Sequence, residues 1–159
     1  MKIVNILRLI VSILICQLAG FIGSIFTTPA IPTWYESLKK PLFNPPNWIF
    51  GPVWVSLYLL MGISLFVIWQ RRANNLQTKR GLILFFAQLI LNAFWSVAFF
   101  GLKSPFSGFI IIVLLWVAIF LTIQNFLKIS KIAALLLLPY ILWVSFAAVL
   151  NFSLWILNM

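Results

Sequence analysis

Long apolar runs alternate along this chain with short clusters of charged residues. Five runs of 22 to 30 residues contain no charged side chain. A helix needs about 20 apolar residues to cross the hydrocarbon core of a bilayer, so each run is long enough to cross once. A transmembrane barrel would instead alternate apolar and polar positions in stretches of about ten residues. The pattern predicts an all-α membrane protein, a bundle of five transmembrane helices that forms a single domain over residues 1–159. The expected helices cover about residues 5–26, 47–70, 80–101, 106–127 and 132–157.

The connection at 27–46 differs from the others in length and composition. It holds five of the eight prolines, together with Trp34, Tyr35 and Phe43. Proline fixes the backbone, and irregular backbone near a membrane must be buried against protein or water. We expect this proline-rich segment to fold back over the helix ends as a lid loop. The connections at 71–79, 102–105 and 128–131 are short, which favours antiparallel packing of successive helices.

Composition and charge support a membrane location. Hydrophobic residues make up 64% of the chain and charged residues only 8%, far from the balance of a soluble domain. The net charge of +10 could indicate nucleic-acid binding, but basic residues beside apolar spans are what membrane orientation requires. Five spans place eight basic residues on the N-terminal side and only Lys39, Lys40 and Lys103 on the other. Assuming a plasma-type membrane, we therefore expect a cytoplasmic N-terminus and no nucleic-acid partner. Lys2 and Arg8 followed by an apolar run also resemble a signal peptide. This run is longer than the apolar region of a usual signal peptide, so we expect the first helix to be retained.

The scarcity of reactive side chains excludes several kinds of chemistry. The chain has no His, one acidic residue, Glu36, and one cysteine, Cys16. A Ser-His-Asp triad, a pair of catalytic carboxylates and a carboxylate-rich metal site cannot be built from these residues within one chain. We expect no catalytic residue of these kinds, no metal site and no required cofactor.

Aromatic and amide residues recur at helical spacing in three of the predicted helices. Spacings of three and four residues put each set on one helix face. The sets are Phe50, Trp54 and Tyr58; Gln88, Asn92, Trp95 and Phe99; and Tyr140, Trp143, Ala147 and Asn151. An unpaired amide is costly in hydrocarbon, so these faces should point inward. They indicate either a pocket for a flat apolar ligand or aromatic packing with hydrogen bonds between helices. Lys39 and Lys40, beside the lid loop, either pair with ligand carboxylates or are solvated.

Several segments resemble one known family. The stretches 34–41 (WYESLKKP), 44–54 (NPPNWIFGPVW), 57–62 (LYLLMG), 88–96 (QLILNAFWS), 139–143 (PYILW) and 147–151 (AAVLN) are similar to motifs of the TspO/MBR family. These are the tryptophan-rich sensory proteins, related to the mitochondrial translocator protein or peripheral-type benzodiazepine receptor. The resemblance covers nearly the whole chain in order, with five spans of the expected length.

The resemblance implies a compact five-helix bundle, often a homodimer, with a pocket under the first loop and between helices one, two and five. Family ligands include porphyrins, haem and benzodiazepine-type drugs, with cholesterol in animal members. By motif position, the expected ligand-binding residues are Tyr35, Pro45, Trp54, Tyr58, Asn92, Trp95, Trp143 and Ala147, with Lys39 and Lys40 near ligand propionates. The animal cholesterol motif, a Tyr then Arg late in helix five, is missing from Asn151–Trp155. The resemblance therefore favours a tetrapyrrole-related role in a prokaryotic cell membrane.

The expected function is a membrane receptor or sensor for porphyrins such as protoporphyrin IX. The ring would stack against Trp54 and Trp143. Metal-free porphyrin is favoured over haem, because haem iron would lack its usual histidine ligand. Two alternatives stay open: light-dependent porphyrin degradation, proposed for some relatives, and transport of porphyrin or lipid.

Overall fold

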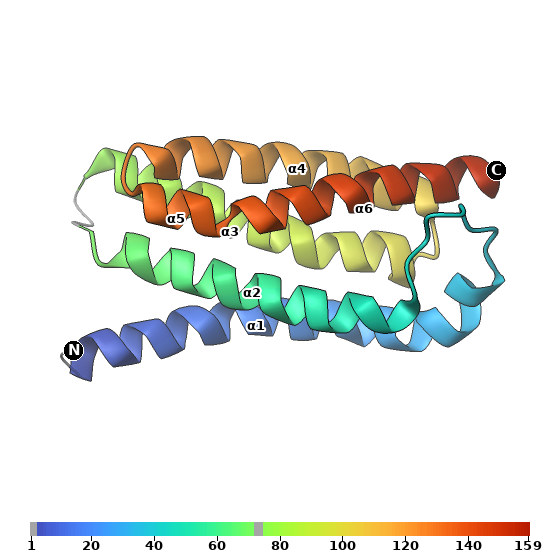
Figure 1. Cartoon of the computed structure of the whole chain (residues 1–159), viewed down its shortest axis with the longest axis horizontal. Coiled ribbons are helices and arrows are strands. Elements are labelled where there is room, and N and C mark those ends of the chain that lie inside the picture. Colours follow the sequence, from blue (N-terminus) through green and yellow to red (C-terminus); the bar gives the residue numbers. More distant parts are fainter. Residues whose placement is uncertain (1–2, 72–74) are drawn as a thin grey trace.

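The structure is a computed structural model that describes residues 3–71 and 75–159. It contains five helical spans and confirms the expected five-helix membrane bundle (Figure 1). The first span joins α1 (Ile3–Ala30) to a π-helical turn, η1 (Ile31–Tyr35), and the second is α2 (Asn47–Trp69). The third joins α3 (Leu76–Ser96) to a second π-helical turn, η2 (Val97–Gly101), and the fourth is α4 (Pro105–Leu127). The fifth is divided into α5 (Lys131–Leu136) and α6 (Leu138–Leu157).

The first span extends well past the expected end at residue 26. Helical structure continues through Pro29 and Pro32 to residue 37, so the irregular segment is 38–46 rather than 27–46. Pro32 lies in the first turn of η1, where its missing N–H costs little. The Thr33 hydroxyl donates to the Pro29 carbonyl oxygen at 2.8 Å and so supports this turn. We call residues 38–46 the lid.

The third span begins earlier than expected, at Leu76 instead of 80. Asn75 caps it, because its side-chain oxygen accepts a hydrogen bond from the Gln77 N–H at 3.0 Å. Lys79 and Arg80 therefore lie within the first turns of α3 rather than in a loop before it.

The fifth span is interrupted where the sequence places Pro139. Proline cannot donate the N–H that a continuous helix needs there, and the chain breaks at Leu137. Within the described residues, α2 packs against α5, whereas the backbones of α2 and α6 stand apart. This separation leaves room inside one half of the bundle.

Successive helices are not all neighbours, although the short connections favoured this. Close packing joins α1 to α2, α3 to α4, and α4 to α6, but α2 and α3 barely touch and α1 packs on α3 instead. The order around the bundle is therefore α2, α1, α3, α4 and the α5–α6 span, which returns to α2.

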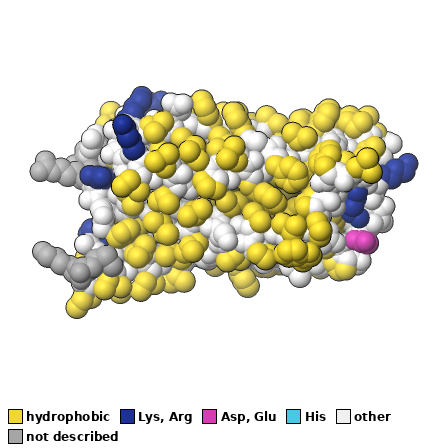
Figure 2. All heavy atoms as spheres, in the orientation of Figure 1, with side chains coloured by type: hydrophobic (Ala, Val, Ile, Leu, Met, Phe, Trp, Pro, Cys, Tyr) yellow, Lys and Arg dark blue, Asp and Glu magenta, His cyan; other side chains and the backbone are white. Residues whose placement is uncertain are grey.

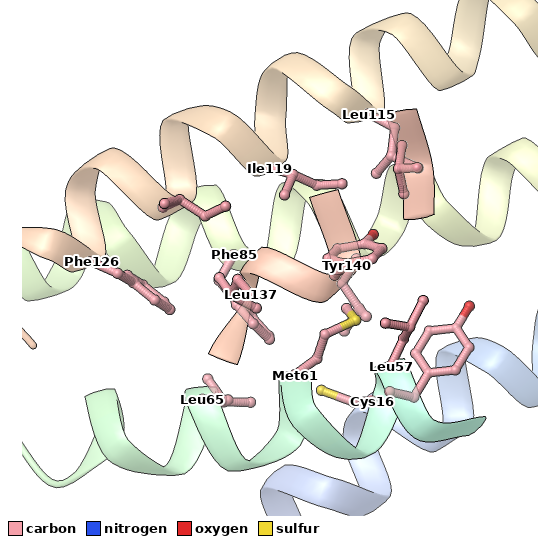
Figure 3. Close-up of a cluster of buried hydrophobic side chains, with 14 of the residues drawn as sticks. Cys16, Leu57, Met61, Leu65, Phe85, Leu115, Ile119, Phe126, Leu137 and Tyr140 are labelled. Carbon is pink, nitrogen blue, oxygen red and sulfur yellow. The ribbon is translucent and has the colours of Figure 1, made fainter. Parts of the chain in front are cut away.

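Interior packing is dense in the half of the bundle that lies away from the lid. Side chains from all five spans meet there, including Cys16, Met61, Phe85, Ile119 and Leu137 (Figure 3). The outer surface is hydrophobic along the middle of the molecule, with Lys and Arg gathered at the two ends (Figure 2). This arrangement matches a bilayer-spanning protein, whose lipid-facing surface is as apolar as its core.

Candidate functional site

A cavity of about 650 Å³ occupies the half of the bundle nearest the lid. Its walls come from α1, η1, α2, α3, η2 and α6, and α4 and α5 contribute none of the lining residues described. Most of the lining is apolar or aromatic, with a few amide and hydroxyl groups. Pockets of about 300–1,000 Å³ with such a lining commonly hold drug-sized molecules.

One wall of the cavity is a row of four aromatic rings that we call the aromatic row: Tyr58, Trp54, Trp95 and Phe99. Successive ring centroids lie 5.6, 6.2 and 5.6 Å apart, with interplanar angles of 29°, 32° and 22°. Each ring is thus inclined to the next by 22–32°, and the four rings form a continuous aromatic part of the cavity wall. The Trp95 indole is held by a hydrogen bond to the Asn151 side-chain oxygen at 3.1 Å.

A buried chain of hydrogen bonds leads from the cavity wall into the core. Tyr58 donates its hydroxyl to the Asn92 Oδ1 atom, and Asn92 Nδ2 donates to the Tyr140 hydroxyl at 2.8 Å. Tyr140 in turn donates to the Gln88 Oε1 atom at 2.8 Å. We call these four residues the polar chain. These bonds pair both side-chain polar atoms of Asn92 and the Gln88 oxygen across helices, whereas the buried Gln88 Nε2 atom has no partner.

Both π-helical turns lie at the lid end of the cavity. In η2, bonds to the fifth residue back, such as Leu102 N–H to the Val97 carbonyl at 2.8 Å, bring the consecutive Phe99 and Phe100 both into the lining. In η1, Ile31 and Tyr35 close the same end. Isolated π-turns inside helices occur frequently at functional sites.

Small residues of α1 allow side chains of α2 and α3 to pack closely against this helix. A Cβ added at Gly20 would lie 2.4 Å from Cε2 of Tyr58, and one at Gly23 would lie 2.8 Å from the Ser96 hydroxyl oxygen. These glycines, with Gln17 and Ser24 beside them, line the cavity. The small residues of the first helix therefore serve the cavity as well as helix packing.

The structure places six of the eight predicted ligand-binding residues in the lining of the cavity. They are Tyr35, Trp54, Tyr58, Asn92, Trp95 and Ala147. Pro45 and Trp143 are not in the lining. The Trp143 ring packs against Phe50, with centroids 6.1 Å apart, and Phe50 is the residue that reaches the cavity. The cavity wall thus includes Trp95 and Phe50, whereas Trp143 lies behind the lining in contact with Phe50.

Lys39 and Lys40 also lie outside the lining. The Lys40 ammonium is 3.7 Å from the Glu36 carboxylate and 5.2 Å from the centre of the Tyr35 ring. The lid backbone at Lys39 is fastened to the end of α6, because the Asn158 side chain accepts from the Lys39 N–H and donates to its carbonyl, both at 2.9 Å. The Tyr35 hydroxyl donates to Asn44 Oδ1 at 2.6 Å, which ties the lid to η1.

Some lining residues were not predicted from the sequence. Ile31, Phe100, Leu150 and Leu154 carry no polar or spacing signal that separates them from ordinary apolar residues. Ile31 and Phe100 enter the cavity through the π-turns. Across residues 3–71 and 75–159, no group of three His, Cys, Asp or Glu side chains is arranged to hold a metal ion.

Comparisons with known proteins identify what this chain is similar to. The model of the TspO/MBR family matches residues 12–156. The tryptophan-rich protein TspO of Archaeoglobus fulgidus is 47% identical over 154 residues, which cover 97% of this chain and 99% of that protein. The protein of the same name from Chlorobaculum tepidum is 45% identical over 158 residues, covering 97% and 98%. The Homo sapiens translocator protein is 33% identical over 142 residues, covering 87% and 83%.

Proposed function

We propose, on the premise that this chain belongs to the TspO/MBR family, that it is a membrane receptor or sensor that binds porphyrins in the cavity. Protoporphyrin IX represents the ligand class: a flat, conjugated and mostly apolar macrocycle. Among the relatives, one is named translocator protein and another tryptophan-rich sensory protein. Ligand binding in this chain is our proposal.

The aromatic row is the observation that carries this proposal. Aromatic rings pair best when offset or tilted, at centroid separations of about 4.5–7 Å. Four contacting rings along one wall, each inclined to the next by 22–32°, therefore suit a flat π system better than a flexible aliphatic chain. The cavity volume of about 650 Å³ is sufficient for a molecule of drug size.

Polar groups at the cavity wall supply the orientation. The Tyr58 hydroxyl and the Asn92 amide are buried and already hydrogen-bonded, so a ligand gains directional contacts from groups that are held in place. The proposed partners of porphyrin propionates remain Lys39 and Lys40, which lie on the lid and outside the cavity. Neither lysine lines the cavity, so contact with the propionates of a ring held in the cavity requires side chains at the lid end to rearrange.

We further propose a prokaryotic cell membrane with the N-terminus in the cytoplasm. Among the described residues, Arg8, Arg71, Lys79, Arg80, Lys128 and Lys131 belong to the end of the bundle that holds the N-terminus. The lid end holds Lys39, Lys40 and Lys103. Basic residues favour the cytoplasmic side of a membrane, which supports this orientation.

Titration with protoporphyrin IX in the dark tests the binding proposal. Protein in lipid nanodiscs should show saturable quenching of tryptophan fluorescence. Trp54→Phe plus Trp95→Phe should weaken binding by about tenfold, because two phenyl rings offer less stacking area than two indoles. Trp69→Phe is the matched control, because Trp69 ends the same helix outside the cavity. Unchanged affinity in the double variant, with wild-type protein bound, would place the ligand elsewhere.

Illumination of the same complex distinguishes a receptor from the light-dependent enzyme. For a receptor, the porphyrin should yield no product beyond what free porphyrin forms in detergent. A protein-dependent product that disappears in Trp95→Phe would instead support degradation.

A further inference from the structure

The exposed residues of the cavity lining all lie on two helices. Phe21 is 65% exposed, Trp48 73% and Val55 58%, and Thr28 and Gly51 are exposed as well. Every one belongs to α1 or α2, whereas the described lining residues from α3, η2 and α6 are buried or half-buried. The cavity therefore opens through the seam between α1 and α2, and we call these five residues the mouth.

Below the mouth, the same seam is closed. A Cβ added at Gly62 would lie 2.6 Å from the Ile13 Cα, so the two backbones are in contact there. Gln17 donates its amide N–H to the Val55 carbonyl oxygen at 3.1 Å, which joins the helices at the lower edge of the mouth. A Cβ added at Gly51, in contrast, would meet no atom within 4 Å. The two helices thus touch in one half and part in the other.

The lid end offers no comparable opening. Tyr35 is 3% exposed, Phe99 2% and Leu154 1%, and no residue of the lid lines the cavity. The lid itself is held by the paired hydrogen bonds between Lys39 and Asn158 and by the bond from Tyr35 to Asn44. The exposed lining residue nearest the lid is Trp48, at the start of α2, and it belongs to the mouth.

The mouth faces the lipid rather than the aqueous phase. At about 1.5 Å per residue, Gly51 lies about 6 Å and Val55 about 12 Å along α2 from Asn47. Large apolar side chains of α1 on either side, Leu18 and Ile25, are exposed in the same span. The hydrocarbon core of a bilayer is about 30 Å thick, so the mouth lies in the half of this core nearest the lid, extending to its edge.

We propose that ligands enter and leave this cavity sideways, directly from the bilayer, through the mouth between α1 and α2. The inference rests on the proposed binding function and adds a ligand class: lipophilic molecules that are already dissolved in the membrane. Gly51 keeps the passage open because it has no side chain there, and Trp48 forms its rim at the membrane interface.

A removable block at Gly51 tests this route. The variant Gly51→Cys is modified in detergent with a benzyl methanethiosulfonate reagent, reconstituted into nanodiscs, and later restored with a reducing agent. Cys16, the only native cysteine, is wholly buried, and intact-mass measurement verifies a single label. Ser56→Cys is the matched control, since Ser56 is exposed on the same helix but does not line the cavity.

Stopped-flow quenching by protoporphyrin IX then gives association and dissociation rates. The labelled Gly51→Cys protein should show both rates reduced about tenfold or more, with recovery on reduction, whereas labelled Ser56→Cys should behave as wild type. Unchanged rates in labelled Gly51→Cys would overturn the lateral route. Failure of the unmodified wild-type protein to bind porphyrin would instead defeat the proposed function, and the route for this ligand with it.

Opening the lid provides the second arm. Asn158→Ala removes both bonds to Lys39, so the association rate should rise only if ligands enter past the lid. A rate equal to that of wild type is expected, and an increase of about tenfold would overturn the proposal in favour of an aqueous route.

Discussion

The indole N–H of Trp95 donates to the side-chain oxygen of Asn151, 3.1 Å away, and so joins the aromatic row on α3 to α6. The same Asn151 amide donates to the Pro105 carbonyl oxygen at 2.7 Å, at the start of α4. One buried amide therefore positions a cavity ring and links three spans.

Replacing this amide should disturb the cavity more than the fold. In Asn151→Leu, the Trp95 indole loses its acceptor and the Pro105 carbonyl loses a donor. Hydrogen bonds between membrane helices contribute about 0.6 kcal/mol on average and up to about 1.7 kcal/mol, so the helices should still assemble. We expect a small loss of thermal stability and a several-fold weaker affinity for protoporphyrin IX, measured by melting and titration in nanodiscs. The control is Ser153→Ala on the same helix, and equal affinities in the two variants would show that Trp95 needs no anchoring.

The polar chain should respond unequally at its two tyrosines. Tyr140 makes two side-chain hydrogen bonds in the core, to Asn92 and Gln88, whereas Tyr58 makes one, to Asn92. Tyr140→Phe leaves two buried groups without a partner and Tyr58→Phe leaves one, so Tyr140→Phe should destabilise the protein more, by about 1–3 kcal/mol for each orphaned group at most.

Reversible unfolding in mixed micelles measures this difference. The reverse order of stability would indicate that the chain is not continuous in the membrane. Ligand affinity should show the opposite order, because only the Tyr58 ring lines the cavity.

Gly20 should tolerate no side chain, because the Tyr58 ring lies against it. In Gly20→Ala the new Cβ would lie 2.4 Å from Cε2 of Tyr58, so the ring must move within the cavity. Overpacking of this kind costs about 1–3 kcal/mol, and porphyrin binding should weaken about tenfold. Ser56→Ala is the control, since Ser56 is exposed and does not line the cavity, and binding should be unchanged. The prediction fails if the two alanine variants bind equally.

The lid should loosen when its bond to α6 is removed. Asn158→Ala eliminates both hydrogen bonds to the Lys39 backbone. Amide hydrogen exchange of residues 38–46 should become at least several-fold faster, while α2 and α4 keep their protection. Lys40→Ala removes the partly exposed ion pair with Glu36, a hydrogen bond to the Glu36 carbonyl oxygen and the contact with the Tyr35 ring, but it leaves both Asn158 bonds in place. Lid exchange should therefore change much less than in Asn158→Ala. Similar acceleration in both variants would mean that side-chain charge, and not Asn158, holds the lid.

Local sequence determined the spans and most of the residues that face inward. A run of 22 or more residues without charge has no alternative to the bilayer, and spacings of three and four residues assign Trp54, Tyr58, Asn92 and Trp95 to interior faces. Hydrogen-bonding cost then requires the amides to find partners inside the bundle.

Tertiary structure alone decided which inward residues reach the cavity. Trp143 follows the same helical spacing as its neighbours, yet Phe50 from α2 lies between it and the cavity. The spacing of residues in the sequence gives their direction around one helix. It does not show which side chains of a second helix pack against that face.

Two further features depended on bonds that no local pattern specifies. Helical structure continues past Pro29 and Pro32 because a π-turn and the Thr33 hydroxyl accommodate them, whereas proline statistics favour a loop. The order of helices around the bundle, with α1 beside α3, follows from how side chains of all five spans fit together. Contacts between distant segments are chosen by the packing of the whole chain, so the cavity and its mouth exist only in the assembled bundle.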